Sequence, residues 1–192
     1  MRRLWAPLAT LVLVVPAVLG AGSGTADHTA DRTGGGTAAG TPTAPAAPAE
    51  RRYVAGPTGE TISLRGDLPG ELLDVTLLAV ADPAAPRDAA ATPAPDGRLV
   101  AVEFRLENTG TAAYADAPRS GSYLLDTGGE RYSGVAVATT AGAGFPDGRS
   151  LAPGASSTGW VTFQLPEDAR PTAVQFALNS GSADDIGQWN LS

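Results

Sequence analysis

Cysteine and lysine are both missing from this chain of 192 residues, in which every basic side chain apart from one histidine is an arginine. Without cysteine there can be no disulfide framework, no thiol nucleophile and no zinc site built on thiolates. The absence of lysine beside abundant Ala, Arg and Gly matches a GC-rich coding bias, so it points to no binding site. An exported domain of this composition must depend on its hydrophobic core alone.

Histidine and methionine are nearly absent as well. The only histidine is His28 and the only methionine is Met1, and both lie outside the part of the chain that we expect to fold. A Ser-His-Asp triad needs a histidine beside the serine, and copper or zinc carriers need His, Cys or Met ligands. We therefore expect a protein that is not an enzyme and that holds no cofactor.

Acidic residues outnumber basic ones, 20 to 13, which gives a formal net charge of −7. A chain with this charge repels phosphate backbones and anionic lipid. We therefore expect no nucleic-acid partner, and contact with a membrane only if the N-terminal segment is retained.

Only one long hydrophobic run occurs, and it lies at the N-terminus. Two arginines precede an apolar run from Leu4 to Leu19, and small residues follow it. This order is typical of a cleaved signal peptide, so we assign residues 1–26 to one, with cleavage near Ala21 or Ala26. A retained membrane anchor is the alternative, although the run is short for a span, which needs about 20 residues.

The next segment, residues 22–52, consists largely of Gly, Thr, Ala, Pro and Ser. It has almost no large apolar side chain and cannot bury enough surface to fold, so it predicts a disordered linker. Such a tether holds a domain away from a membrane or wall. The folded domain then spans residues 53–192.

The clearest strand signal is the stretch from Arg98 to Gly110. Its apolar side chains, Val100 to Leu106 at every second position, alternate with Ala101, Glu103, Arg105 and Glu107. This pattern is typical of a strand with one face in a core and the other in water. The run ends in Asn108-Thr109-Gly110, residues that tolerate turn geometry.

Other short segments have the composition of strands and are separated by turn signals. They are Thr58–Leu64, Leu72–Ala81, Ser122–Asp126, Glu130–Val137, Gly159–Pro166, Ala173–Asn179 and Ile186–Leu191. Together they predict an all-β fold, an antiparallel two-sheet immunoglobulin-like sandwich of about seven to eight strands, with a closed barrel as the alternative. The predicted inward-facing side chains are Ile62, Leu64, Leu73, Val75, Leu77, Val100, Val102, Phe104, Leu106, Val161, Phe163, Val174, Phe176 and Leu178.

Two motifs carry a resemblance to a known family. One is the valine-rich strand that ends in Glu107-Asn-Thr-Gly110, and the other is Leu151-Ala-Pro-Gly154 followed by Gly159-Trp-Val-Thr-Phe-Gln-Leu-Pro166. Over about Thr58 to Leu191 the chain resembles the secreted immunoglobulin-like domains of unknown function that Gram-positive bacteria carry behind lipoprotein signals. Those domains are similar in fold to a small secreted mycobacterial antigen. The resemblance implies fold and export, and it brings no catalytic residues.

This chain departs from that family in one respect that matters for its location. Many such relatives attach to the membrane through a lipidated cysteine, and this chain has no cysteine. Thioether lipidation is therefore excluded, and we expect a secreted protein, with association to the cell surface as the alternative.

Two kinds of ligand contact stay open. Carboxylates in predicted loops could bind calcium or act as an acid/base pair, although no Asp-x-Asp-x-Asp spacing occurs. Aromatic side chains could form a platform that stacks on sugars. The carboxylate candidates are Asp126, Glu130, Asp147, Asp184 and Asp185. The aromatics of such a platform would be Tyr114 and the four candidate ligand contacts Trp160, Trp189, Tyr123 and Tyr132.

Two functional hypotheses follow. The leading one is a non-enzymatic extracytoplasmic binding module whose partner is an envelope or extracellular protein, met through short loops and an exposed sheet edge. The alternative is a glycan-binding or weakly hydrolytic envelope domain. Aromatics gathered in one exposed cleft beside two carboxylates would favour the alternative, and aromatics scattered through the core would favour the first.

Overall fold

The computed structural model describes residues 51–191 except 89–90, 92 and 147–149. The predicted signal peptide and nearly all of the predicted linker therefore lie outside the described residues. Within the described part of the chain, no helix is both long enough and apolar enough to cross a membrane.

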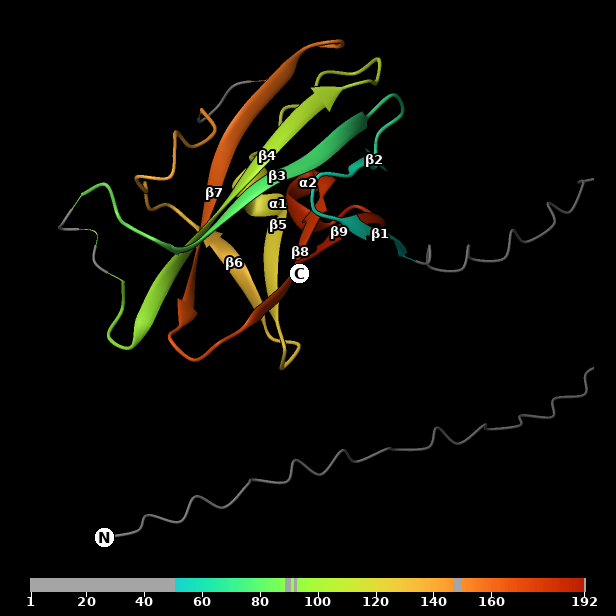
Figure 1. Cartoon of the computed structure of the whole chain (residues 1–192). Coiled ribbons are helices and arrows are strands. Elements are labelled where there is room, and N and C mark those ends of the chain that lie inside the picture. The colour runs from blue at the N-terminus through green and yellow to red at the C-terminus, as the bar shows by residue number, and fades with distance from the viewer. Residues whose placement is uncertain (1–50, 89–90, 92, 147–149, 192) are drawn as a thin grey trace, which may run out of the picture. The chain divides into compact units, whose positions relative to one another are not determined.

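The domain consists of nine strands and two helices of one turn (Figure 1). The strands are β1 (Arg52–Pro57), β2 (Thr61–Arg65), β3 (Leu72–Ala84), β4 (Gly97–Asn108), β5 (Ser122–Asp126), β6 (Arg131–Val135), β7 (Ser156–Pro166), β8 (Pro171–Ala177) and β9 (Asp185–Asn190), and the helices are α1 (Pro118–Gly121) and α2 (Leu178–Gly181).

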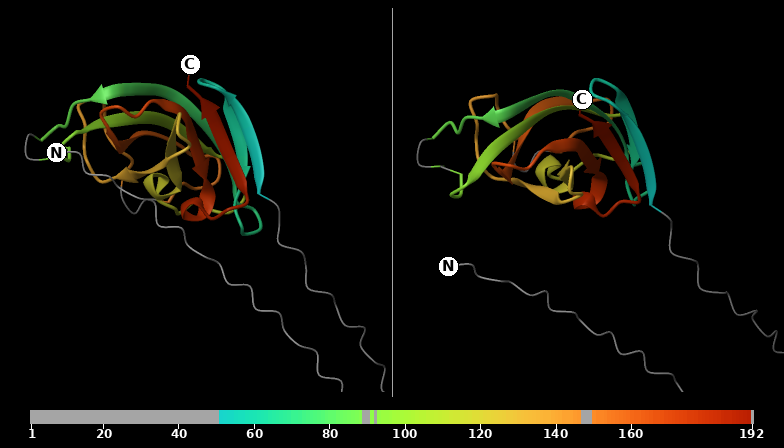
Figure 2. Two further views of the ribbon diagram at one scale, coloured as in Figure 1. Left: turned by 90° about the horizontal axis from the view of Figure 1, so that it is seen from below. Right: turned by 60° about the horizontal axis from the view of Figure 1, so that its bottom comes forward.

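The strands form one hydrogen-bonded sheet in the order β1-β9-β8-β5-β6-β7-β4-β3-β2, which corrects the predicted division into two separate sheets of seven to eight strands. The physical reason is β6, which pairs with β5 through residues 131–133 and with β7 through Gly134 and Val135. Figures 1 and 2 show the strands curving round a common interior. The prediction of an all-β domain with a sandwich-like core is confirmed.

The two ends of this sheet come close together. β1 pairs in parallel with β9, and β2 pairs only with β3. Across the gap, the Asp185 carboxylate of β9 accepts a hydrogen bond from the Arg65 backbone N–H of β2 (3.1 Å). It also accepts from Arg52 Nε (2.7 Å) on the neighbouring strand β1. The Trp189 indole N–H donates to the Glu60 carbonyl at 2.8 Å. Side chains thus connect the edges where no strand ladder does, and the sheet is nearly closed.

The predicted first strand, Thr58–Leu64, is wrong in its placement. Residues 57–60 form a turn between β1 and β2, in which the Glu60 N–H donates to the Pro57 carbonyl (3.2 Å). Gly59 has a φ of +91°, which is favourable only for glycine. The chain therefore reverses where the composition suggested a continuous strand.

β4 is the central strand, as its alternation indicates, because it pairs along nearly its whole length with both β3 and β7. Its last residue, Asn108, is buried, and its amide Nδ2 donates to the carbonyls of Ala112 and Leu151, both at 2.8 Å. The Asn108 carbonyl accepts from the Gly154 N–H at 2.7 Å. The two family motifs are therefore in direct contact, which explains why they occur together.

Every residue of the predicted inward-facing set is buried in one core. Phe104 lies at its centre, with the rings of Phe176 and Trp189 packed edge-on at 5.4 and 5.9 Å between centroids. A second, smaller cluster lies on the opposite face of β4, where Leu99 and Ala101 are buried. The outward face of β4 is therefore solvated only in its second half, where Arg105 pairs with Glu107 at 2.8 Å.

We expect Phe104→Asp to prevent folding, because an unpaired carboxylate would replace a ring at the centre of the core and cost more than about 4 kcal/mol. The neighbouring Glu103→Arg should change the free energy of unfolding by no more than about 0.5 kcal/mol, because Glu103 lies on the outward face. Urea unfolding of both variants measures the difference, and equal losses would contradict the strand register.

Stability should also fall in acid because of Asp185. The hydrogen bonds from Arg52, supported by the Arg65 N–H, hold the pKa of this carboxyl below its ordinary value of 3.8. A lowered carboxyl pKa stabilises the folded state above the ordinary value, and this stability is lost as the pH falls through the lowered pKa. Asp185→Asn should be less stable at pH 7 and should lose less stability between about pH 4 and pH 2. Thermal unfolding across this range is the measurement, with Asp184→Asn as the control, and parallel curves for Asp185→Asn and the wild type would contradict the assignment.

Candidate functional site

The regular sheet is interrupted beside β7. β6 stops pairing after Val135, which lies opposite Thr162, and the loop of residues 136–146 leaves the sheet there. This loop crosses to the residues that follow β3, where the Thr140 N–H donates to the Ala85 carbonyl (2.9 Å). It returns to β7, where the Trp160 N–H donates to the Ala143 carbonyl (3.0 Å).

A cavity of about 370 Å³ lies at this interruption, and we call it the Trp160 cavity. Its walls come from residues 115–119, from both arms of the 136–146 loop, and from residues 160–162 of β7. The two arms contribute apolar Val137 and Phe145. Gly142 closes one side, and a side chain could not replace its hydrogen, because a Cβ there would lie 2.2 Å from Trp160 Nε1.

Two further cavities, of about 180 and 230 Å³, share residues with the first. The smaller of them shares Asp116, Pro118 and Phe145 with the Trp160 cavity. Both of the further cavities are lined by Tyr114 and Asp116. The three cavities therefore form a row along residues 114–119, which we call the groove.

Two buried hydroxyl groups in the walls of the groove have no hydrogen-bond partner among the described residues. Tyr114 is 8% exposed and lines the two smaller cavities, and Thr139 is 2% exposed and lines the Trp160 cavity. Burial, with a contribution from Asp116, raises the pKa of the Tyr114 hydroxyl, so it is a neutral donor at any physiological pH. These are the only buried unpartnered side-chain polar atoms in the described part of the chain, and both belong to the groove.

The charged side chains of the groove differ in how they are bound. Asp116 accepts a hydrogen bond from the Ser180 hydroxyl at 2.8 Å. Glu71 accepts from Asn179 Nδ2 at 3.3 Å. The exposed Arg119 forms no ion pair with another described residue. The lining of the Trp160 cavity therefore includes one acidic side chain, Asp116, and one basic side chain, Arg119, whereas the cavity of about 230 Å³ has two acidic ones, Glu71 and Asp116.

The four predicted ligand-contact aromatics do not come together. Trp160 is half-buried and lines the Trp160 cavity, as a contact residue should. Trp189 is fully buried in the core, so its prediction as a ligand contact is wrong. Its strand, β9, is an interior strand of the sheet and turns this side chain inward against Phe104.

The two tyrosines lie elsewhere. Tyr123 is half-buried, with the guanidinium of Arg131 4.0 Å from its ring centre. Tyr132 packs against the core and donates a hydrogen bond to Asp126 at 2.8 Å. This bond raises the pKa of Tyr132 to about 12 and lowers the pKa of Asp126. Neither tyrosine lines the groove.

The carboxylate candidates do not form one site, and two of them bind neighbouring groups of the fold. Asp185 binds Arg52, and Asp126 caps the β5–β6 hairpin by accepting from the N–H groups of Gly128 and Glu130. Asp147 lies outside the described residues. No three of the described His, Asp and Glu side chains lie close enough together to hold a metal ion.

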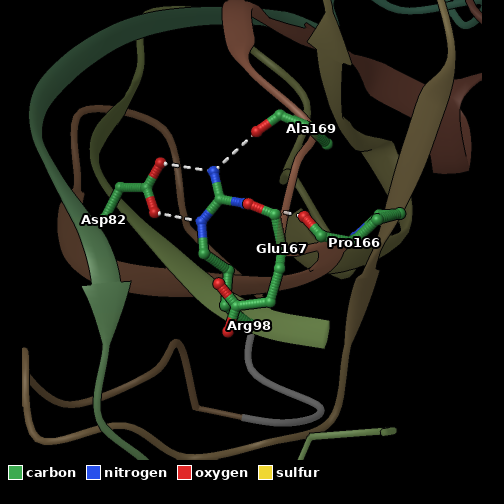
Figure 3. Close-up of polar contacts among 5 residues, drawn as sticks. All are labelled: Asp82, Arg98, Pro166, Glu167 and Ala169. Atoms are coloured by element: carbon green, nitrogen blue, oxygen red, sulfur yellow. Dashed lines mark hydrogen bonds and ion pairs between the residues drawn. The ribbon is translucent and has the colours of Figure 1, made fainter. Parts of the chain in front are cut away.

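The densest polar cluster in the domain centres on Arg98 (Figure 3). Its Nε and Nη2 donate to the carboxylate of Asp82 at 2.7 and 3.0 Å, and its guanidinium also donates to the carbonyls of Pro166, Glu167 and Ala169 at 2.7 to 2.9 Å. Protein groups thus use all five N–H donors. This arginine anchors the β7–β8 connection to β4 and has no donor left for a ligand.

Sequence reasoning missed Thr139, Arg119 and the role of residues 114–119, since none of them carries a motif. One signal was available. Trp160 points away from the core on β7, and the loop after β6 contains Gly142 and Gly144. Glycines in such a loop indicate that its backbone approaches another group closely, which here is the outward tryptophan.

The fold and the groove define the class of this protein: a small all-β domain of one curled sheet with a groove large enough for a ligand. The sequence profile of the family "Domain of unknown function (DUF4352)" matches residues 72–186, more than half of the chain. The chain belongs to this family, which confirms the expected kinship with a family of domains of unknown function. A search of curated protein sequences finds no match.

Solved structures that are similar to this chain include proteins of three bacteria. The secreted protein MPT63 from Mycobacterium tuberculosis superposes with a TM-score of 0.54 at 18% identity, over 73% of this chain and 98% of its own. This likeness shows the fold, and it confirms the expected similarity to a small secreted mycobacterial protein.

Two further structures are less similar. They are the yjhA protein of Bacillus subtilis, with 17% identity, coverage of 70% and 98% and a TM-score of 0.47, and an uncharacterized β-sandwich protein of Clostridium difficile 630, with 11% identity, coverage of 76% and 99% and a TM-score of 0.46.

Removing either unpartnered hydroxyl should stabilise the free protein. Thr139→Val keeps the shape of the side chain and removes a buried hydroxyl that makes no hydrogen bond, so we expect the free energy of unfolding to rise by about 1 kcal/mol. Tyr114→Phe should act in the same direction. Ser122→Ala is the control, because the buried Ser122 hydroxyl donates to the Pro118 carbonyl at 2.6 Å and its loss should destabilise. Destabilisation by Thr139→Val in chemical denaturation would contradict this account of the groove.

Proposed function

We propose that this domain is a non-enzymatic extracytoplasmic binding module that holds an extended segment of another envelope or extracellular protein in the groove. The carrying observation is the coincidence of the row of cavities with both unpartnered buried hydroxyls. A buried donor without a partner costs stability, and a ligand that accepts its hydrogen bond removes this cost. The aromatic and arginine side chains at the groove are of the kinds enriched at interface hot spots.

A loop-lined groove replaces the exposed sheet edge in this proposal. Side chains of β9 connect the two ends of the sheet: Asp185 accepts from the Arg65 N–H of β2, and Trp189 donates to the Glu60 carbonyl in the turn between β1 and β2. The walls of the Trp160 cavity come instead mostly from loops that a nearly closed sheet supports. Loops held by a rigid scaffold are a frequent location for binding residues.

The glycan-binding or hydrolytic alternative receives less support. Sugar binding on a platform needs aromatic rings on one face, and here Trp160, Tyr123 and Tyr132 lie in different environments while Trp189 is buried. Hydrolysis by paired carboxylates needs two of them facing one cleft. The predicted candidates Asp126 and Asp185 are both bound to neighbouring side chains. Glu71 and Asp116 line one cavity, and each accepts a hydrogen bond from a neighbouring side chain, Asn179 and Ser180 respectively.

The proposed location is outside the cytoplasm. The arginine-led apolar run at the N-terminus is what an export signal looks like, and MPT63, which shares the fold, is described as secreted. Because the chain has no cysteine, release or a retained N-terminal anchor must take the place of a lipid. An interaction between extracellular proteins fits this location.

Site-specific crosslinking tests the proposal. A photoreactive residue at Ala117, which is exposed and lines the Trp160 cavity, should capture a discrete protein on the surface of the cells that make this chain. The same residue at Ala55, exposed on β1 and outside the groove, is the matched control. Capture should fall at least tenfold when Trp160→Ala is added to the Ala117 variant, because the aromatic wall is lost.

Two outcomes would overturn the proposal. Equal capture from both positions would show that the groove is not the contact surface. Retention of purified cell-wall polysaccharide by the wild type, with no protein captured at Ala117, would favour the glycan alternative.

A further inference from the structure

We propose that the Trp160 cavity binds the C-terminal residue of the partner, taking its apolar side chain against Trp160 and Phe145 and its terminal carboxylate against Arg119. This inference rests on the proposed function and specifies its ligand. It follows from the size of the cavity, from the position and partners of Arg119, and from the unpartnered hydroxyl of Thr139.

The volume of the Trp160 cavity fits one residue. At about 370 Å³ it is close to the lower limit of ligand pockets, which hold roughly 300 to 1,000 Å³. Val137, Phe145 and Trp160 give it apolar walls from both arms of the loop and from β7. An aliphatic or aromatic side chain placed there loses its contact with water, at roughly 25 cal/mol per Å² of apolar surface removed.

Arg119 supplies a positive charge that other groups leave available. Its aliphatic part lies against Gly134, where a Cβ would approach Arg119 Cγ to 2.7 Å, and the exposed side chain lines the cavity. Arg52, Arg98 and Arg105 pair with carboxylates, whereas Arg119 pairs with no described residue. A guanidinium binds a carboxylate through two parallel hydrogen bonds, which is the geometry a chain terminus offers.

The Thr139 hydroxyl adds a polar contact inside the apolar walls. It is 2% exposed and has no partner among the described residues, yet it lines the cavity. A hydroxyl can donate to a carbonyl or carboxylate oxygen. A C-terminal residue places such oxygens beside its own side chain, so one ligand can satisfy both Arg119 and Thr139.

The loop contributes mainly to this one cavity. Residues 136–139, Gly142 and Gly144 line the Trp160 cavity and neither of the two smaller cavities. Capture of a C-terminal carboxylate is a known mode of peptide recognition.

NMR titration of the ¹⁵N-labelled full chain tests the inference with two probe peptides, acetyl-Ala-Ala-Phe with a free carboxylate and the same peptide with a C-terminal amide. The indole N–H of Trp160 reports on the cavity, and that of Trp189, buried and bonded to Glu60, is an internal control. We expect a saturable shift at Trp160 alone, with the free acid bound at least tenfold more tightly than the amide. Arg119→Gln should abolish this preference, and Arg105→Gln, on the outward face of β4, should preserve it.

Equal affinity for acid and amide, or a preference that survives Arg119→Gln, would overturn the inference. If crosslinking at Ala117 captures a protein but the free acid does not bind, the inference fails while the proposed function stands. If the free acid binds but no protein is captured, the cavity is a site for small carboxylates, and both the proposed function and the C-terminal ligand are wrong. Thr139→Val should weaken binding of the free acid by about fivefold, since the removed hydroxyl bond contributes about 1 kcal/mol.

Discussion

The short strand β6 divides its hydrogen bonds between two neighbours, and much of the domain depends on this division. Through residues 131–133 it belongs with β5, and through Gly134 and Val135 it belongs with β7. One sheet therefore curls round a single core where two separate sheets were expected. The ladder between β6 and β7 ends at Val135, so on the side of β7 opposite β4 no strand lies beside Trp160. The loop after β6 pairs with Trp160 there and lines the cavity.

The groove has a rigid support, but some residues in its walls reduce the stability of the fold. Asn108 ties the end of β4 to the residues before β7, and Arg98 ties the other end of β4 to the β7–β8 connection, so the strands under the groove are held at both ends. The groove also has unfavourable local features. Two buried hydroxyls have no partner among the described residues, and Asn179 in its wall lies in the left-handed region with a φ of 54°. Binding sites often retain such unfavourable local features because a ligand offsets them.

The strands and the core could be predicted because alternation is a local property. Val100, Phe104 and Leu106 recur at every second position, and a sheet residue cannot face the core without its neighbours facing away. Errors arose where a local signal was ambiguous. Gly59 lies in a turn at the start of the expected strand Thr58–Leu64, of which only Thr61–Leu64 belongs to a strand, β2. Trp189 was expected at a surface although β9 is an interior strand of the sheet.

The sequence by itself determined the class of fold, the buried faces of the strands and the chemistry that is impossible without cysteine or a histidine in the domain. Tertiary structure alone decided which strands are neighbours, which tryptophan meets solvent, and that Thr139, Arg119 and Tyr114 line one groove. The physical reason is the separation in sequence between the residues that interact. Side-chain alternation acts between adjacent residues, whereas pairing partners and cavity walls join segments far apart in the chain, whose meeting depends on the free energy of the whole domain.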